Sequence, residues 1–143
     1  MKKVLLVFSM AFAIIGCREE TAHETSTSSS STSSTITTTT SAKITVLKSS
    51  NSTPQKNISV LMFKSKPSIT GNQALPTILK EVVTNDKGEA IFDLSSMVTS
   101  STGEKFYFGA FRKSGDSYVL LSTYFPERVI KKNSVISTVI PIN

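Results

Sequence analysis

Residues 82–94 read Val-Val-Thr-Asn-Asp-Lys-Gly-Glu-Ala-Ile-Phe-Asp-Leu, and this segment carries the clearest structural pattern in the sequence. Its centre, residues 85–88, has the chemistry of a tight turn, because Asn and Asp bond their own backbone and Gly tolerates positive φ. After the turn, Ala90, Phe92 and Leu94 recur at every second position, which is the period of a half-buried strand. We therefore expect a strand, a turn and a second strand, with these three side chains pointing into a core.

The same alternation recurs on both sides of this unit. We predict seven strands, at residues 43–48, 58–63, 77–84, 89–94, 105–113, 118–125 and 134–142. Gly, Pro, Ser and Asn fill the turns between them, with a hairpin turn at 114–116 and loops at 64–76 and 126–133. The sequence holds no long amphipathic helix. The fold class predicted for residues 43–143 is therefore all-β, a seven-stranded antiparallel β-sandwich.

Parts of this pattern resemble transthyretin-like domains, which have the prealbumin fold. The matching segments are Ile44-Thr45-Val46, a polar turn with Pro54, Ile58-Ser59-Val60, and the stretch from Val82 to Phe92. Carboxypeptidase regulatory-like domains and the B-type repeats of Gram-positive adhesins share the last pattern. The resemblance implies a prealbumin-like strand arrangement. Another immunoglobulin-like sandwich is the alternative, although the chain has no Trp and no Cys pair.

The resemblance also bears on activity. Enzymes among the transthyretin relatives hydrolyse hydroxyisourate with His and Arg residues and a C-terminal Tyr-Arg-Gly-Ser. This chain has one His, His23, outside the predicted sandwich, and it ends Ile140-Pro141-Ile142-Asn143, so that activity is not implied here. Adhesin repeats can carry an internal Lys–Asn isopeptide bond. The candidates for one here are Lys48 with Asn133 or Asn143, assisted by Glu81 or Glu89.

The first seventeen residues have the features of a bacterial lipoprotein export signal. Lys2 and Lys3 precede an apolar run over 4–15. This run is shorter than the roughly 20 residues that span a bilayer, but it suits a secretory signal. It ends in Ile14-Ile15-Gly16-Cys17, which resembles the lipobox, whose Cys is acylated and becomes the mature N-terminus. Because the chain has one cysteine, no internal disulfide can form, and we interpret it as the acyl acceptor.

The residues after the cysteine predict a tether. From 25 to 41 every residue except Ile36 is Ser or Thr. So polar a segment cannot offset a backbone ordering cost of roughly 1–2 kcal/mol per residue, so we expect 17–42 to be a disordered, lipid-anchored linker. Arg18-Glu19-Glu20 resembles the signal that sends Bacteroidetes lipoproteins to the outer face of the outer membrane. The predicted location is the cell envelope, as an outer-membrane lipoprotein, with surface display as a further expectation.

Charge indicates the kind of partner. Thirteen of the sixteen Lys and Arg residues, but only seven of the ten Asp and Glu residues, fall within 43–143. Basic and aromatic residues interleave near its C-terminal half, and an anionic glycan or an acidic envelope protein is the partner we expect there, by general electrostatic attraction. An envelope location makes nucleic acid an unsuitable partner. The candidate anionic-ligand surface consists of Arg112, Lys113, Arg128, Lys131 and Lys132.

These observations together predict a non-enzymatic lipoprotein, a binding or structural accessory module held on a flexible tether. No catalytic residue, metal site or cofactor is predicted, because the sequence has no nucleophile elbow, phosphate-binding loop or Cys/His metal spacing. One alternative is a small glycan-active enzyme, which would need two carboxyl groups roughly 5–10 Å apart. The other is a subunit of a larger outer-membrane complex.

Overall fold

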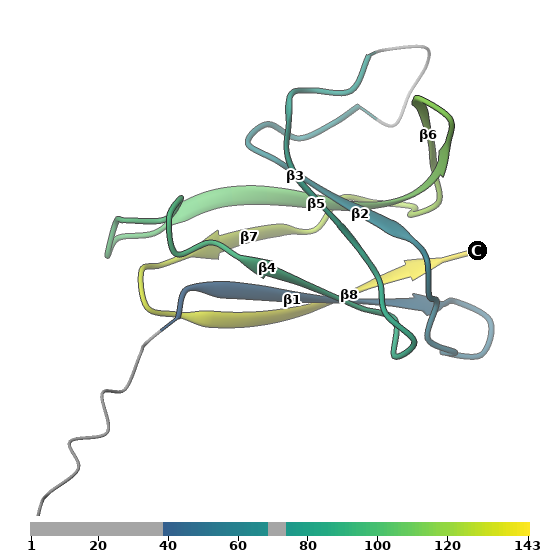
Figure 1. Cartoon of the computed structure of the whole chain (residues 1–143), viewed down its shortest axis with the longest axis horizontal. Coiled ribbons are helices and arrows are strands. Elements are labelled where there is room, and N and C mark those ends of the chain that lie inside the picture. Colours follow the sequence, from purple (N-terminus) through teal and green to yellow (C-terminus); the bar gives the residue numbers. More distant parts are fainter. Residues whose placement is uncertain (1–38, 69–73) are drawn as a thin grey trace, which may run out of the picture. The chain divides into compact units, whose positions relative to one another are not determined.

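The computed structural model describes residues 39–68 and 74–143, and the predicted signal, lipobox and most of the tether lie outside these ranges. The described part is built of eight strands and no helix (Figure 1). They are β1 (Ser41–Lys48), β2 (Ser59–Phe63), β3 (Ile78–Val83), β4 (Glu89–Asp93), β5 (Glu104–Ser114), β6 (Ser117–Leu120), β7 (Glu127–Ile130) and β8 (Val135–Ile142).

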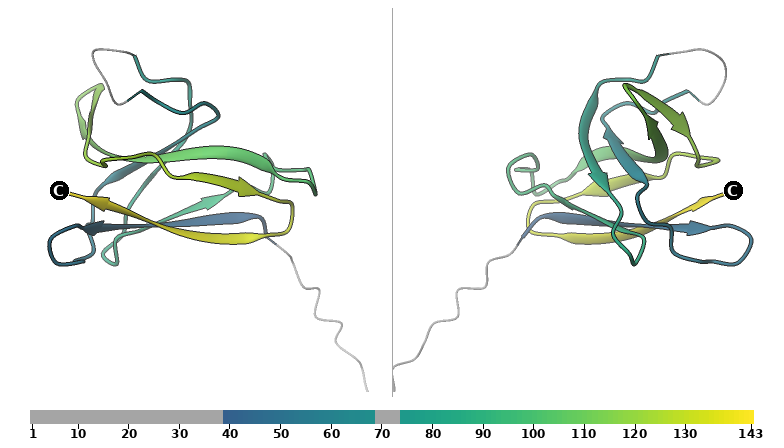
Figure 2. Two further views of the ribbon diagram at one scale, coloured as in Figure 1. Left: turned by 180° about the vertical axis from the view of Figure 1, so that it is seen from behind. Right: turned by 45° about the vertical axis from the view of Figure 1, so that its right-hand side comes forward.

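The strands form two facing sheets, which confirms the β-sandwich. The first sheet has the order β4-β1-β8 and the second the order β3-β2-β5-β6, with β7 also paired to β5. All pairs are antiparallel except β1 with β8, the first and last strands, which run parallel in register from Ser41 opposite Val135 to Lys48 opposite Ile142. Both views in Figure 2 show the long β5 facing the sheet of β1 and β8.

The strand count differs from the prediction at one place. Residues 126–133 were expected to be a loop, but Glu127–Ile130 forms β7 and pairs with Glu104–Tyr107 of β5. Its three leading residues are exposed and only Ile130 is buried, so the strand carries too few apolar residues to produce a visible period of two. The predicted strand 118–125 correspondingly shortens to β6. This strand pairs only with the last part of β5, from Phe111 to Ser114, and β7 pairs with the first part.

The main core lies between the two sheets and has the predicted register. Ala90, Phe92 and Leu94 are fully buried, whereas Ile91 is 58% exposed. From the other sheet, Phe106, Phe108 and Ala110 enter the same cluster. The rings of Phe92 and Phe108 meet edge to face with centroids 5.4 Å apart, a favourable aromatic geometry.

A second apolar cluster covers the outer face of the five-stranded sheet. It contains Leu61, Phe63, Phe111 and Phe125, all nearly inaccessible to solvent. Gly109 makes room for it, since a Cβ there would lie 2.5 Å from Cε1 of Phe125. Phe125 belongs to the segment after β6, which folds back over the sheet. β2 is therefore buried on both faces.

The folded part begins earlier than the predicted strand at 43. β1 starts at Ser41, and Thr40 before it is only 2% exposed. The Thr40 hydroxyl accepts a hydrogen bond of 2.8 Å from the backbone N–H of Asn133. The backbone carbonyl of Thr40 accepts one of 2.9 Å from the backbone N–H of Leu94. A threonine at the end of a Ser/Thr run is thus part of the fold, which composition could not reveal.

Candidate functional site

The structure places the five candidate ligand-binding cations at two separate ends of the sandwich. Arg112 and Lys113 lie near the end of β5, where it pairs with β6. Arg128 lies on β7 opposite Phe106 near the start of β5, and Lys131 and Lys132 follow β7. Seven residues of strand separate Phe106 from Lys113, which is about 23 Å at roughly 3.3 Å per residue. One compact ligand could not contact all five.

Two of the five are also bonded within the domain. Lys113 forms an ion pair of 3.5 Å with Glu81 and lies over the ring of Tyr118 at 5.5 Å. Arg128 donates to the carbonyl of Glu127 at 2.8 Å and to the hydroxyl of Thr138. A ligand would have to displace these contacts. Within the described ranges, Arg112, Lys131 and Lys132 have no ion pair and are the more available cations.

Glu81 is a well-connected polar group of the five-stranded sheet, although sequence reasoning assigned it no role in ligand binding. It lies on β3, and its carboxylate accepts a 2.7 Å hydrogen bond from the hydroxyl of Tyr118 on β6. That hydrogen bond lowers the pKa of Glu81; partial burial opposes the effect, and Ser59 and Lys113 lower the pKa further. The same bond to Glu81 raises the pKa of Tyr118. One carboxylate on β3 thus contacts side chains of β5 and β6.

Glu127 forms a similar group at the other end of the sheet. Its carboxylate accepts a hydrogen bond of 2.7 Å from the hydroxyl of Tyr107 and forms an ion pair of 2.9 Å with Lys105. The bond from Lys105, followed by that from Tyr107, lowers the pKa of Glu127, and the carboxylate in turn raises the pKa of both partners. These two Tyr–Glu–Lys groups frame the outer apolar cluster, to which both Tyr rings contribute apolar surface. Both groups join neighbouring strands of the sheet through side-chain bonds.

A pH titration tests whether Glu81 ties the strands. A folded pKa below the ordinary value of 4.5 gives stability that is present above pH 4.5 and lost as the pH falls through the folded pKa. Glu81→Gln should therefore lower the free energy of unfolding by about 1 kcal/mol at pH 7, a value reduced for its partial exposure. Urea unfolding at pH 7 and pH 3 should show this difference shrinking at pH 3. An equal loss at both pH values would contradict the role of the ionised carboxylate.

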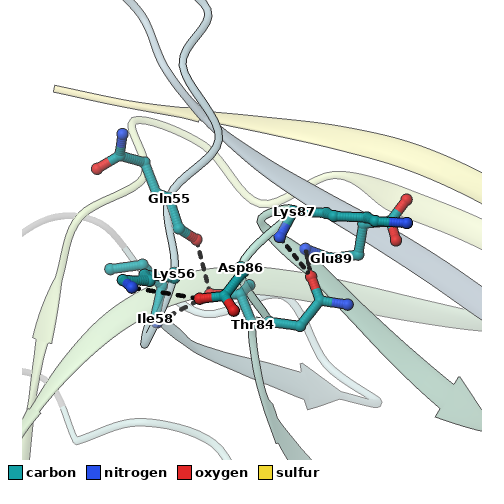
Figure 3. A network of polar contacts seen from close by, with 8 residues as sticks. Gln55, Lys56, Ile58, Thr84, Asp86, Lys87 and Glu89 are labelled. Atoms are coloured by element: carbon teal, nitrogen blue, oxygen red, sulfur yellow. Dashed lines mark hydrogen bonds and ion pairs between the residues drawn. The ribbon is translucent and has the colours of Figure 1, made fainter.

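The turn between β3 and β4 is held by a polar network, shown in Figure 3. The hydroxyl of Thr84 accepts from the backbone N–H of Ile58 at 3.0 Å and donates to the carbonyl of Gln55 at 2.7 Å. Asn85 Oδ1 accepts from the backbone N–H groups of Lys87 and Glu89 at 2.9 and 3.0 Å. The loop before β2 is thereby fixed against this turn, as expected of turn residues.

Other sequence-based candidates are placed as follows. Lys48 lies opposite Ile142 at the end of β1, while Glu89 pairs with Lys43 at 3.1 Å and Glu81 is bonded as described, so both proposed assisting acids have other partners. The described ranges contain no group of three His, Cys, Asp or Glu side chains placed to hold a metal ion. They also contain no helix long and apolar enough to cross a membrane. The predicted lipid site Cys17, the lipobox Ile14-Ile15-Gly16 and the export signal lie outside those ranges.

Comparison with protein-family models and with curated proteins finds no match. Among solved structures, the chain is similar to the major pilin subunit BcpA of Bacillus cereus, with 12% identity, a TM-score of 0.45 and coverage of 73% of this chain and 30% of that one. A streptococcal ancillary pilin has 11% identity and a TM-score of 0.46, over 76% of this chain and 33% of that one. The pilus 2b backbone protein of group B streptococcus has 12% identity and a TM-score of 0.44, over 73% of this chain and 42% of that one. The chain spans less than half the length of each.

Proposed function

We propose that the chain is a non-enzymatic module of the cell envelope, held at the membrane by acyl chains on Cys17 and presented on its Ser/Thr-rich tether. The observation that supports the non-enzymatic part is the use of the carboxylates. Glu81, Glu89, Glu104 and Glu127 each pair with a lysine on another strand or loop, at 2.7–3.5 Å. Such cross-strand pairs serve the sheet that they join.

The alternative, a glycan-active enzyme, fits these carboxylates poorly. Glycoside hydrolysis needs one carboxyl group whose raised pKa keeps it protonated as a general acid. The pKa values of Glu81 and Glu127 are lowered by their Tyr and Lys partners. These two residues also lie on β3 and β7, with β2 and β5 between them. Three strand spacings of about 4.8 Å exceed the separation that a hydrolase uses.

The envelope part of the proposal is supported by the sequence of the first twenty residues. An apolar run, a small residue and the single Cys17 match a lipoprotein signal in order and spacing. Several acyl chains, at about 0.8 kcal/mol per buried CH₂, would anchor the protein durably, whereas one chain alone is marginal. The tether would present the sandwich to an anionic glycan, an acidic envelope protein or the other subunits of an outer-membrane complex.

Cell fractionation tests the anchoring. The wild-type chain should sediment with membranes and be released by detergent but not by high salt, because acyl chains resist salt. The Cys17→Ser variant has no acyl acceptor and should be recovered in the soluble fraction. A Ser9→Ala variant within the apolar run is the matched control and should fractionate like the wild type. Detergent-free release of the wild type by salt would overturn the proposal.

A further inference from the structure

We propose that the end of the domain where the chain enters from the tether is a basic docking surface for an anionic lipid bilayer. This surface, the basal turn, consists of residues 131–134 with Lys131 and Lys132. The proposal rests on the proposed function, since acylated Cys17 is what brings the domain to the bilayer. It goes further by assigning the domain an orientation on the membrane.

The basal turn is fixed beside the point where the chain enters the domain. The backbone N–H of Ser41 donates to the carbonyl of Ser134 at 3.0 Å, and Asn133 donates to the hydroxyl of Thr40. Asn133 has a φ of 60°, which this tight turn requires. Figure 2 shows the turn between β7 and β8 next to the start of β1. Whatever precedes residue 39 therefore leaves the domain beside these lysines.

The turn is also rigid, which keeps the two charges together. The hydroxyl of Ser134 donates to the carbonyl of Lys131 at 2.6 Å and accepts from its N–H at 3.1 Å. The N–H of Lys132 donates to the carbonyl of Ser100 at 3.0 Å. The stem of Lys131 lies over Gly103, where a Cβ would come within 3.0 Å of its Cγ. Both side chains are exposed and neither forms an ion pair within the described residues.

The charges around the basal turn leave this excess uncancelled. The two acids near the turn each have another cation beside them: Lys80 donates to the backbone carbonyl of Asp93 at 2.6 Å, and Glu104 pairs with Lys64 at 2.7 Å. The neighbouring loop contributes the uncharged Ser100, Ser101 and Thr102. Basic residues beside a membrane anchor attract anionic headgroups with about 1 kcal/mol each, so two lysines should favour the docked state about 30-fold.

The opposite end of β1 supplies a matched control. Lys48 ends that strand and Lys87 lies in the turn that bonds to it, and both are exposed without an ion pair in the described ranges. The eight residues of β1 place this end about 23 Å from the basal turn. The two lysines at each end thus carry equal charge and lie at different distances from the point where the chain enters the domain.

Fluorescence quenching by headgroup-labelled lipid tests the orientation. Full-length acylated protein, purified from membranes, carries a fluorophore at Ser101→Cys beside the basal turn or at Ser50→Cys at the far end. Both serines are exposed, and acylation of Cys17 leaves the new thiol as the one to label. In phosphatidylcholine vesicles with 30% phosphatidylglycerol, the 101 probe should be quenched strongly and the 50 probe weakly. Pure phosphatidylcholine or 0.5 M salt should abolish the difference.

Charge removal completes the test. Lys131→Gln with Lys132→Gln should lower the ratio of docked to undocked protein about 30-fold, whereas Lys48→Gln with Lys87→Gln should leave it unchanged. Equal quenching of both probes, stronger quenching at position 50, or docking that survives loss of the basal lysines would overturn the docking surface alone. Protein that the vesicles do not retain through Cys17 would overturn the proposed function, and the docking surface with it.

Discussion

Phe92→Ala should destabilise the domain by about 3–5 kcal/mol, the cost of a large cavity in a well-packed core. Phe92 is fully buried and its ring meets that of Phe108 across the two sheets. Since a domain of this size has a total stability of about 5–15 kcal/mol, much of it would be lost. Urea unfolding followed by circular dichroism measures the change, with the midpoint falling and the slope unchanged.

Ile91→Thr is the control for the register. Ile91 is adjacent in sequence but 58% exposed on the outer face of its sheet, so its substitution should cost no more than about 1 kcal/mol. If Phe92→Ala unfolded close to the wild type while Ile91→Thr lost most of its stability, β4 would be inverted. The assignment of Ala90 and Leu94 to the core would then be wrong as well.

Gly88→Ala should have the second large effect, a loss of about 2–4 kcal/mol. Gly88 has a φ of 70°, which costs an L-residue about 1–2 kcal/mol. A Cβ there would also lie 2.7 Å from the carbonyl oxygen of Val46 and 2.9 Å from the nitrogen of Gln55. Both atoms belong to the backbone, so the turn would have to move away and weaken the 2.8 Å bond from Val46 N–H to the Gly88 carbonyl.

Gly115→Ala separates the two causes. Gly115 has a similar φ of 59°, but a Cβ there meets no atom within 4 Å. It should therefore cost only the backbone term of about 1–2 kcal/mol. Thermal unfolding of the two variants side by side compares them directly. Equal losses would show that the close approach of β1, the turn and the loop before β2 contributes nothing.

Much of the fold could be predicted from the local alternation of apolar and polar residues. Ala90, Phe92 and Leu94 follow a turn at period two, and the register they predict is the one observed, because one face of β4 is buried and the other exposed. The hairpin turn at 114–116 joins β5 and β6 as expected. The parallel pairing of β1 with β8 could not be predicted in this way, since it joins segments almost a hundred residues apart and leaves no local pattern.

The outer apolar cluster escaped prediction for a related reason. Leu61 and Phe63 alternate with Val60 and Met62, so the run from 60 to 63 is apolar on both faces. Such a run is typical of a strand covered on both sides, and Gly109 opposite Leu61 was the one further sign that something packs closely there. What covers the sheet is Phe125, in a segment that was predicted to continue a strand.

The candidate site was predicted only in part. The interleaving of basic and aromatic residues indicated Lys113 and Arg128. It could not indicate the cross-strand bonds of Glu81 and Glu127, because their Tyr partners are 37 and 20 residues away in the sequence. The predicted cations are separated because Arg112 and Lys113 lie near the end of β5, whereas Arg128 lies on β7, which pairs with the start of β5. The basal turn could not be predicted, because the bond that places it beside the start of β1 joins Asn133 to Thr40, which are 93 residues apart.

Mass spectrometry of the protein extracted from membranes tests the acylation of Cys17. We expect the most N-terminal peptide to begin at Cys17, to lack residues 1–16 and to carry the added mass of acyl chains on that cysteine. Intact mass should agree with residues 17–143 plus those chains. A membrane-extracted protein whose first residue lies elsewhere, or whose Cys17 is a free thiol, would contradict the account.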